Sequence, residues 1–189
     1  MNTDSAKTYK ILVVDDEDSV IRSYSSVLTT VAESSVDEKL EDLASELFGA
    51  SNVEPEVSFT VSVCKQGNEA VELVEQSIAM GDDCRFAVVF IDMRMPPGIH
   101  GLEAANIIHE ADPAIKIVIV TGYSDLTIDQ TKASLPSTAN VYYVQKPFEG
   151  NDIWVLASAL SKQWGGESLT NPDEQVVLDR YTLQNMAAA

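Results

Sequence analysis

Charged and hydroxyl side chains follow short apolar runs at four places in this sequence. Two aspartates, Asp15 and Asp16, come directly after the first run, and Asp92 ends a later one. Thr121 and Lys146 follow two further runs. Each of these signals alone is typical of a solvated turn, but three carboxylates, a hydroxyl and an ammonium in one place would form a site for phosphoryl chemistry. Whether these side chains lie close together depends on the secondary-structure elements that position them.

The apolar runs indicate strands. There are five, mostly β-branched or aromatic: ILVV at 11–14, VSFTVSV at 57–63, FAVVFI at 86–91, IKIVIV at 115–120 and VYYV at 141–144. Stretches with helical spacing lie between them, which predicts repeated β-α units and an open, doubly wound α/β sheet of parallel strands. In such a sheet the carboxyl ends of the strands share one edge, so the polar side chains are expected to converge there.

The converging carboxylates predict a metal-assisted phosphoryl acceptor. Three neighbouring carboxylates repel one another, which raises a pKa or recruits a hard divalent cation, and Mg²⁺ suits oxygen-only ligands. With the cation bound, one carboxylate can attack a phosphoryl group. Lys146 would then neutralise the transferred oxygens, and Thr121 would hydrogen-bond one of them.

Four segments of the sequence resemble, in order and spacing, those of the response-regulator receiver domains of two-component signalling: KILVVDDEDS, VVFIDMRMPPGIHGLE, IVIVTGYSD and YYVQKPF. The resemblance covers about residues 9–163, apart from an insertion. It implies a flavodoxin-like (CheY-like) fold with a five-stranded parallel sheet of order 2-1-3-4-5. It also implies a cis peptide bond between Lys146 and Pro147.

The same resemblance implies roles for the residues at the sheet edge. The metal ligands would be Asp15, Asp16, Asp92 and the backbone carbonyl of Arg94. Asp92 would be the phosphoacceptor, and Thr121 and Lys146 would sense the phosphoryl group. Tyr143 would form the conformational switch together with Thr121, although an aromatic side chain in a strand is more often simply packed. Mg²⁺ is the one cofactor implied.

The resemblance implies a phosphorylation switch that catalyses only its own phosphorylation and dephosphorylation. Its donor would be a histidine kinase or a phosphotransfer protein, and transfer to Asp92 would change contacts with a partner or an output domain. Two alternatives are a degenerate receiver that acts only as an interaction scaffold and a haloacid-dehalogenase-like phosphatase. The phosphatase needs a second aspartate two positions after the nucleophile, where this chain has Arg94. A flavodoxin-like FMN carrier is disfavoured because the acidic segment DDEDS would repel phosphate.

We expect a receiver domain over residues 9–164 that contains an acidic helical insertion over 29–56. The insertion holds eight acids and one base, and neither Gly nor Pro interrupts residues 18–48. One long helix or two near-collinear helices are therefore predicted from about Asp18 to Phe48. An apolar stripe within 31–48 would pack on a second copy of the chain or on another helix. The alternative is a hairpin that breaks at Ser34-Ser35 and covers its own stripe.

Residues 165–189 are predicted to form a linker and a short tail helix. Gly165-Gly166 would end the preceding helix, and Asn171-Pro172 would begin the tail helix, which could lead to an output domain outside this sequence. The apolar side of the tail helix is expected to comprise Val176, Val177, Tyr181 and Leu183.

The amino-acid composition limits the classes of binding partner that are expected. The chain has 189 residues, enough for one domain with an appendage, and its formal net charge is −18. Such a polyanion is repelled by nucleic-acid phosphates and by anionic membrane surfaces, so neither is an expected partner. The two cysteines, Cys64 and Cys84, are too few for a disulfide scaffold, and the N-terminal residues contain neither a signal peptide nor a membrane span. A cytoplasmic location is expected.

Overall fold

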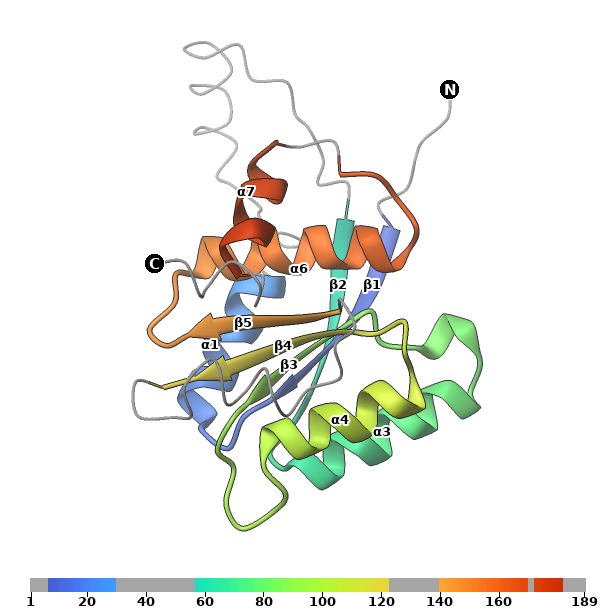
Figure 1. Ribbon diagram of the computed structural model, residues 1–189, viewed down its shortest axis with the longest axis vertical. Helices are drawn as coiled ribbons and strands as arrows, with labels where there is room; N and C mark the ends of the chain where they lie inside the picture. Colours follow the sequence, from blue (N-terminus) through green and yellow to red (C-terminus); the bar gives the residue numbers. More distant parts are fainter. Residues whose placement is uncertain (1–6, 30–56, 123–139, 170–171, 182–189) are drawn as a thin grey trace, which may run out of the picture.

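Strands and helices alternate along the chain in a computed structural model that describes residues 7–29, 57–122, 140–169 and 172–181 (Figure 1). The elements are β1 (Lys7–Val14), α1 (Asp18–Thr29), β2 (Val57–Cys64), α3 (Gly67–Ala79), the short 3₁₀ helix η2 (Asp82–Cys84), β3 (Val88–Asp92), α4 (Gly101–Ala111), β4 (Lys116–Thr121), β5 (Val141–Gln145), α6 (Gly150–Trp164) and α7 (Pro172–Tyr181). All five predicted strands are present.

The five strands form one parallel sheet in the order β2-β1-β3-β4-β5, which confirms the predicted fold class. Val14 pairs with both Cys64 and Ile91, and Thr121 pairs with Gln145, so the strands end close to one another at a single edge. β1 starts four residues before its apolar run because Lys7–Lys10 continue the ladder opposite Val57–Thr60.

Helices cover both faces of the sheet, with α3 and α4 on one side and α1 and α6 on the other (Figure 1). All residues of β3 and all but the first of β4 are buried. Burial on both faces explains why these strands are continuous apolar runs rather than alternating ones. Successive residues then supply the two cores in turn, as Phe90 does on the α1/α6 side and Ile91 on the α3/α4 side.

The strand order reverses between β1 and β3, the two strands that carry the predicted acidic residues. In doubly wound sheets, functional groups gather beyond the carboxyl ends of the strands at such a reversal. The fold therefore places the ends of β1 and β3 where a site is expected.

The helical insertion predicted over 29–56 lies outside the described residues, except for Thr29. α1 begins at Asp18, as predicted, and is described to Thr29. The apolar stripe within 31–48 and the alternative break at Ser34-Ser35 stay predictions.

The tail helix is present as α7, and it follows a turn in which Gly166 has a φ of 75°. The expected apolar side of this helix is partly wrong: Val176 is 58% exposed, whereas Leu178 is buried. Leu183 lies outside the described residues. In the described part of the chain, no helix combines the length and apolar character needed to span a membrane.

Candidate functional site

Three of the predicted site residues meet directly at the carboxyl edge of the sheet. The Nζ atom of Lys146, which follows β5, lies 2.7 Å from Oδ2 of Asp15 and 2.7 Å from Oδ1 of Asp92. One ammonium therefore bridges two carboxylates that come from different strands. The convergence predicted from the strand ends is observed for these three side chains.

Backbone amides hold the remaining oxygen of each carboxylate. The amide of Glu17 donates to Oδ1 of Asp15 over 2.9 Å, and the amide of Arg94 donates to Oδ2 of Asp92 over 2.7 Å. Aspartate commonly accepts such a bond from the residue two positions later, where the chain leaves a strand and turns. Both carboxylates are thus fixed from two sides, and Asp15 is only 2% exposed.

The loop after β3 returns very close to Asp92. The amide of Gly101, the first residue of α4, donates to the carbonyl of Met93 over 3.1 Å. A Cβ atom on Gly101 would lie 1.9 Å from the carbonyl oxygen of Asp92. Only glycine allows this approach, so its position couples the start of α4 to the backbone of Asp92.

Burial and charge act in opposite directions on the titratable groups of the site. Burial raises the pKa of Asp92 above its ordinary value of 3.8, although Lys146 and the Arg94 amide act to lower it. Burial alone would lower the pKa of Lys146, but hydrogen bonds and charge from Asp15 and Asp92 outweigh it, so this pKa is raised. The ammonium is therefore held charged by two carboxylates, while Asp92 still carries a desolvation cost.

The other predicted residues lie around this cluster. Thr121 ends β4, is 1% exposed, and its carbonyl accepts a 2.7 Å bond from the amide of Lys146. Tyr143 is 5% exposed and packs in the core on the α3/α4 side of the sheet. Asp16 and Arg94 are exposed. The bond between Lys146 and Pro147 is cis, as the resemblance implied.

Asp15 and Asp92 already bind one positive charge, the ammonium of Lys146. Their carboxylate oxygens are also of the type that binds a hard cation. Mg²⁺ prefers carboxylate and carbonyl oxygens with room for water, and exposed Asp16 directly follows Asp15. Within the ranges that the structure describes, however, no three Asp, Glu, His or Cys side chains are grouped so that they could hold a metal ion. The ligand set of Asp15, Asp16, Asp92 and the Arg94 carbonyl therefore stays a prediction.

Tyr24 of α1 is a neighbour of the site that the sequence did not single out. Its ring packs against those of Phe90 and Phe148, with centroids 5.2 Å and 5.1 Å away, and its side chain is almost fully buried. The hydroxyl has no hydrogen-bond partner among the described residues. Burial, and then the charges of Asp15 and Asp92, raise the Tyr24 pKa well above 10.0. Its helical spacing indicated only a packing residue.

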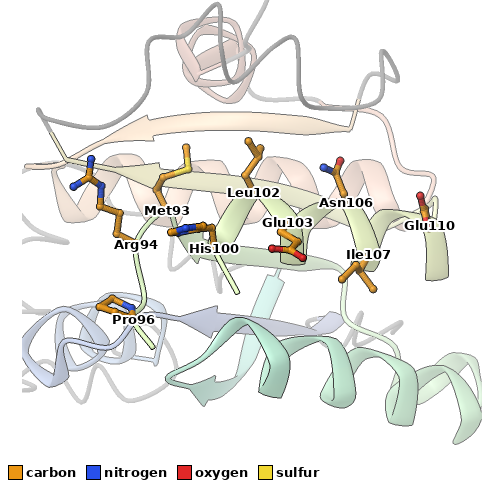
Figure 2. A pocket seen from close by; sticks show the side chains of 9 residues that line it. All are labelled: Met93, Arg94, Pro96, His100, Leu102, Glu103, Asn106, Ile107 and Glu110. Carbon is orange, nitrogen blue, oxygen red and sulfur yellow. The ribbon is translucent and has the colours of Figure 1, made fainter. Parts of the chain in front are cut away.

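A hollow of about 700 Å³ lies along α4, next to the site (Figure 2). Arg94 and His100 line one end and Glu110 the other, with Leu102 and Ile107 of α4 between them. Of the described residues, neither Asp92 nor Lys146 lines this hollow. The carboxylate cluster is thus a separate feature, and Arg94 is the residue that touches both regions.

Comparison with known proteins identifies the same family as the motifs. The model of the response regulator receiver domain family matches residues 41–157, which contain Asp92, Thr121 and Lys146, while β1 and Asp15-Asp16 precede that range. The photosynthetic apparatus regulatory protein RegA of Rhodobacter capsulatus is 31% identical over 106 residues, 56% of this chain and 53% of RegA. The chain thus spans about half the length of that curated relative.

Solved structures show the same fold. A response regulator receiver protein from Sinorhizobium medicae WSM419 has a TM-score of 0.55 and 21% identity, covering 85% of this chain and 99% of that chain. A CheY-like receiver domain protein from Methanospirillum hungatei JF-1 has a TM-score of 0.57 and 18% identity, covering 86% and 100%.

Proposed function

The chain belongs to the response regulator receiver domain family, and from that premise we propose that it is a phosphoacceptor in a two-component phosphorelay. A histidine kinase or a phosphotransfer protein would donate a phosphoryl group to Asp92. The observation that carries the proposal is the bridge from Lys146 to Asp15 and Asp92, because it places a nucleophilic carboxylate beside a fixed positive charge.

In the proposed reaction, a carboxylate oxygen of Asp92 attacks the phosphorus atom of the donor. The bond from phosphorus to the donor's histidine nitrogen breaks, its electron pair stays on that nitrogen, and an acyl phosphate forms on Asp92. The ammonium of Lys146 would support the phosphoryl oxygens electrostatically. The hydroxyl of Thr121, which donates to the carbonyl of Gly122 over 3.2 Å in this structure, would hydrogen-bond one of them instead. Mg²⁺, held by Asp15, Asp16, Asp92 and the Arg94 carbonyl, would supply further positive charge for the phosphoryl oxygens.

The proposed switch uses Thr121, which ends β4, and Tyr143, which lies within β5. A phosphoryl group on Asp92 would compete with the carboxylates for Lys146 and draw Thr121 towards it. Tyr143 lies in β5 opposite Ile119 and is packed inward in this structure, so a movement of the β4 end would alter its surroundings. Partner or output contacts would then change at this side of the sheet.

The test is phosphorylation of the full chain by acetyl phosphate with MgCl₂, followed by intact-mass spectrometry. The wild type should gain the mass of one phosphoryl group, and Asp92→Asn should not. Asp83→Asn removes an exposed acid of η2, which precedes β3, whereas Asp92 ends that strand; this variant is the matched control that should still be modified.

Each alternative function predicts a different result. A scaffold-only receiver would show no phosphoryl gain in the wild type, which would contradict the proposal. A phosphatase would release many equivalents of phosphate per chain, with rapid turnover. Loss of the modification in Asp83→Asn but not in Asp92→Asn would refute the assignment of Asp92.

A further inference from the structure

The turn between β2 and α3 packs against the loop between β3 and α4. This β2–α3 turn comprises Lys65 and Gln66, and the β3–α4 loop comprises residues 93–100. α3 and α4 lie side by side on one face of the sheet, and both begin at the same edge because they follow parallel strands (Figure 1). A Cβ atom on Gly67, the first residue of α3, would lie 2.7 Å from Cγ1 and 2.9 Å from the carbonyl oxygen of Ile99. The start of α3 and the β3–α4 loop are therefore in direct backbone contact.

The side-chain amide of Gln66 bonds the backbone of the β3–α4 loop at two points. Its Oε1 atom accepts a bond from the amide of Gly98 over 3.0 Å, and its Nε2 atom donates to the carbonyl of Pro96 over 3.4 Å. Pro96 and Pro97 are exposed and have no backbone N–H, so they add little burial and no donor to hold this part of the loop. Gln66 supplies a donor and an acceptor to the loop from outside it.

Gln66 does not use its side chain to cap its own helix. It is the N-cap residue of α3, with a φ of −136° and a ψ of 147°, and within the described chain its side chain makes no capping bond to that helix. The residues preferred at this position, Ser, Thr, Asp and Asn, have short side chains that reach the amides of the first turn. The backbone carbonyl of Gln66 still accepts the first helical bond, from Ala70 over 3.1 Å. Its backbone therefore begins α3, while its side chain serves the neighbouring loop.

The clamped part of the loop is continuous with the residue that holds Asp92. The amide of Arg94 donates to Oδ2 of Asp92 over 2.7 Å. The next residue, Met95, is buried, and its carbonyl accepts a 3.2 Å bond from the same Gly98 amide that Gln66 contacts. The backbone that orients the Arg94 N–H is thus closed into a turn by the Gly98 amide, and Gln66 holds that amide from the side of α3.

The β2–α3 turn has a rigid base in the sheet. β2 pairs with β1 along its whole length, and its last residue, Cys64, lies opposite Val14. The carbonyl of Cys64 also accepts a 3.2 Å bond from the amide of Asp15. Gln66 follows two residues after Cys64, so its side chain extends from the backbone that supports Asp15 to the loop that supports Asp92. A group held on paired strands is positioned more precisely than one held by a loop alone.

We propose that Gln66 is a positioning residue for phosphoryl transfer to Asp92. Its side chain fixes the β3–α4 loop, and the loop keeps the Arg94 amide directed at Oδ2 of Asp92. Because Lys146 binds Oδ1, the carboxylate then stays in one orientation, and less freedom is lost on reaching the transition state. The role in transfer rests on the proposed function of Asp92, whereas the coupling from Gln66 to the Arg94 amide does not.

The coupling is tested by amide hydrogen exchange of the unphosphorylated full chain, followed residue by residue by NMR. Gln66→Met keeps the side-chain length but removes both bonds, so the Arg94 amide should exchange about fivefold faster, as expected for the net loss of one hydrogen bond. The Glu17 amide makes the same type of bond, to Asp15 over 2.9 Å, and should be unchanged. Gln76→Met makes the same change at an exposed position of α3 and is the matched control.

Three results of the exchange experiment would contradict the coupling. Equal exchange of the Arg94 amide in Gln66→Met and Gln76→Met would overturn it. Equal acceleration at Arg94 and at the amides of β3 would show that Gln66 supports only the fold as a whole. Gln66→Glu keeps an acceptor for the Gly98 amide, so exchange at Arg94 should return to within about twofold of the wild type; exchange as fast as in Gln66→Met would contradict the role given to the Gly98 bond.

Phosphorylation by acetyl phosphate with MgCl₂ tests the role in transfer. Gln66→Met should lower the maximal rate about fivefold and leave the half-saturating acetyl phosphate concentration unchanged, because Gln66 orients the nucleophile rather than binding the donor. Gln76→Met should match the wild type in both. An unchanged maximal rate in Gln66→Met, together with faster exchange at Arg94, would refute the positioning role. No phosphoryl gain in the wild type would refute the proposed function and with it the role in transfer, whereas the exchange result would still decide the coupling.

Discussion

Replacing Gly101 with alanine is expected to destabilise the chain by about 2 kcal/mol. Gly101 begins α4 directly against the backbone of β3 at Asp92. A Cβ atom there would lie 1.9 Å from the carbonyl oxygen of Asp92, 2.9 Å from its carbonyl carbon and 3.1 Å from Cα of Met93. All three are backbone atoms, so no rotation of a side chain relieves the contact.

The magnitude follows from two opposing effects. Normal van der Waals contact requires α4 and β3 to separate by about 1 Å, and overpacking of this kind costs about 1–3 kcal/mol. We expect the upper end because Asp92 is held on both sides, by β4 through the Met93 amide and by Lys146. Alanine gains at most about 1 kcal/mol over glycine in a helix, and less at the first position. The difference leaves about 2 kcal/mol of destabilisation.

Gly98→Ala in the same loop is the matched control. Its Cβ would meet Oε1 of Gln66 at 2.5 Å, which is the end of a flexible side chain. Rotation of this amide loses the bond from the Gly98 amide, worth about 1 kcal/mol. Urea unfolding of the full chain, followed by circular dichroism, measures both variants. A loss of stability in Gly101→Ala no larger than that in Gly98→Ala would refute the reasoning.

Two further substitutions test the surroundings of the site. Tyr24→Phe removes a buried hydroxyl that has no described partner and should stabilise the chain by about 1 kcal/mol, whereas Tyr9→Phe loses a 2.6 Å bond to Glu167 and should destabilise it; urea unfolding that gives both variants the same sign contradicts this. Asp92→Asn should be more stable than the wild type at neutral pH. Burial raises the folded-state pKa above 3.8, so the wild type has its full stability from this group below 3.8 and loses it as pH rises through the folded-state pKa. The stability gained by Asp92→Asn over the wild type, measured by urea unfolding, should therefore be larger at about pH 7 than at about pH 4. An equal gain at both pH values would refute the raised folded-state pKa of Asp92.

The strands were predictable because both faces of the sheet are buried. Each buried strand must then be a short, continuous apolar run, and such runs need no knowledge of the tertiary structure. The start of β1 escaped this criterion because Lys7 and Thr8 are exposed strand residues whose place is set by pairing with Val57 and Ser58. Pairing across the sheet is a tertiary effect that the local pattern does not contain.

The site was predictable to the extent that strand order fixes it. Asp15, Asp92 and Lys146 each stand at a strand end, so parallel topology alone brings them to one edge. The sequence did not predict that Lys146 would contact both Asp15 and Asp92, because these contacts depend on the side-chain conformations at the ends of three strands. The unpartnered hydroxyl of Tyr24 depends on how α1 packs over β3, and its sequence signal is the same as that of any apolar residue in the helix.

The tail helix shows where hydropathy fails as a guide to burial. Its apolar pattern favoured Val176 as a buried residue, yet the inward face of α7 consists of buried Glu174 and Leu178 and half-buried Tyr181, at positions i, i+4 and i+7. This stripe begins with a charged residue, so hydropathy cannot select it. Glu174 and Lys162 form an ion pair that is buried in the interface between α7 and α6. The two charges stabilise each other's burial only when both helices are present, which is why neither helix reveals the contact alone.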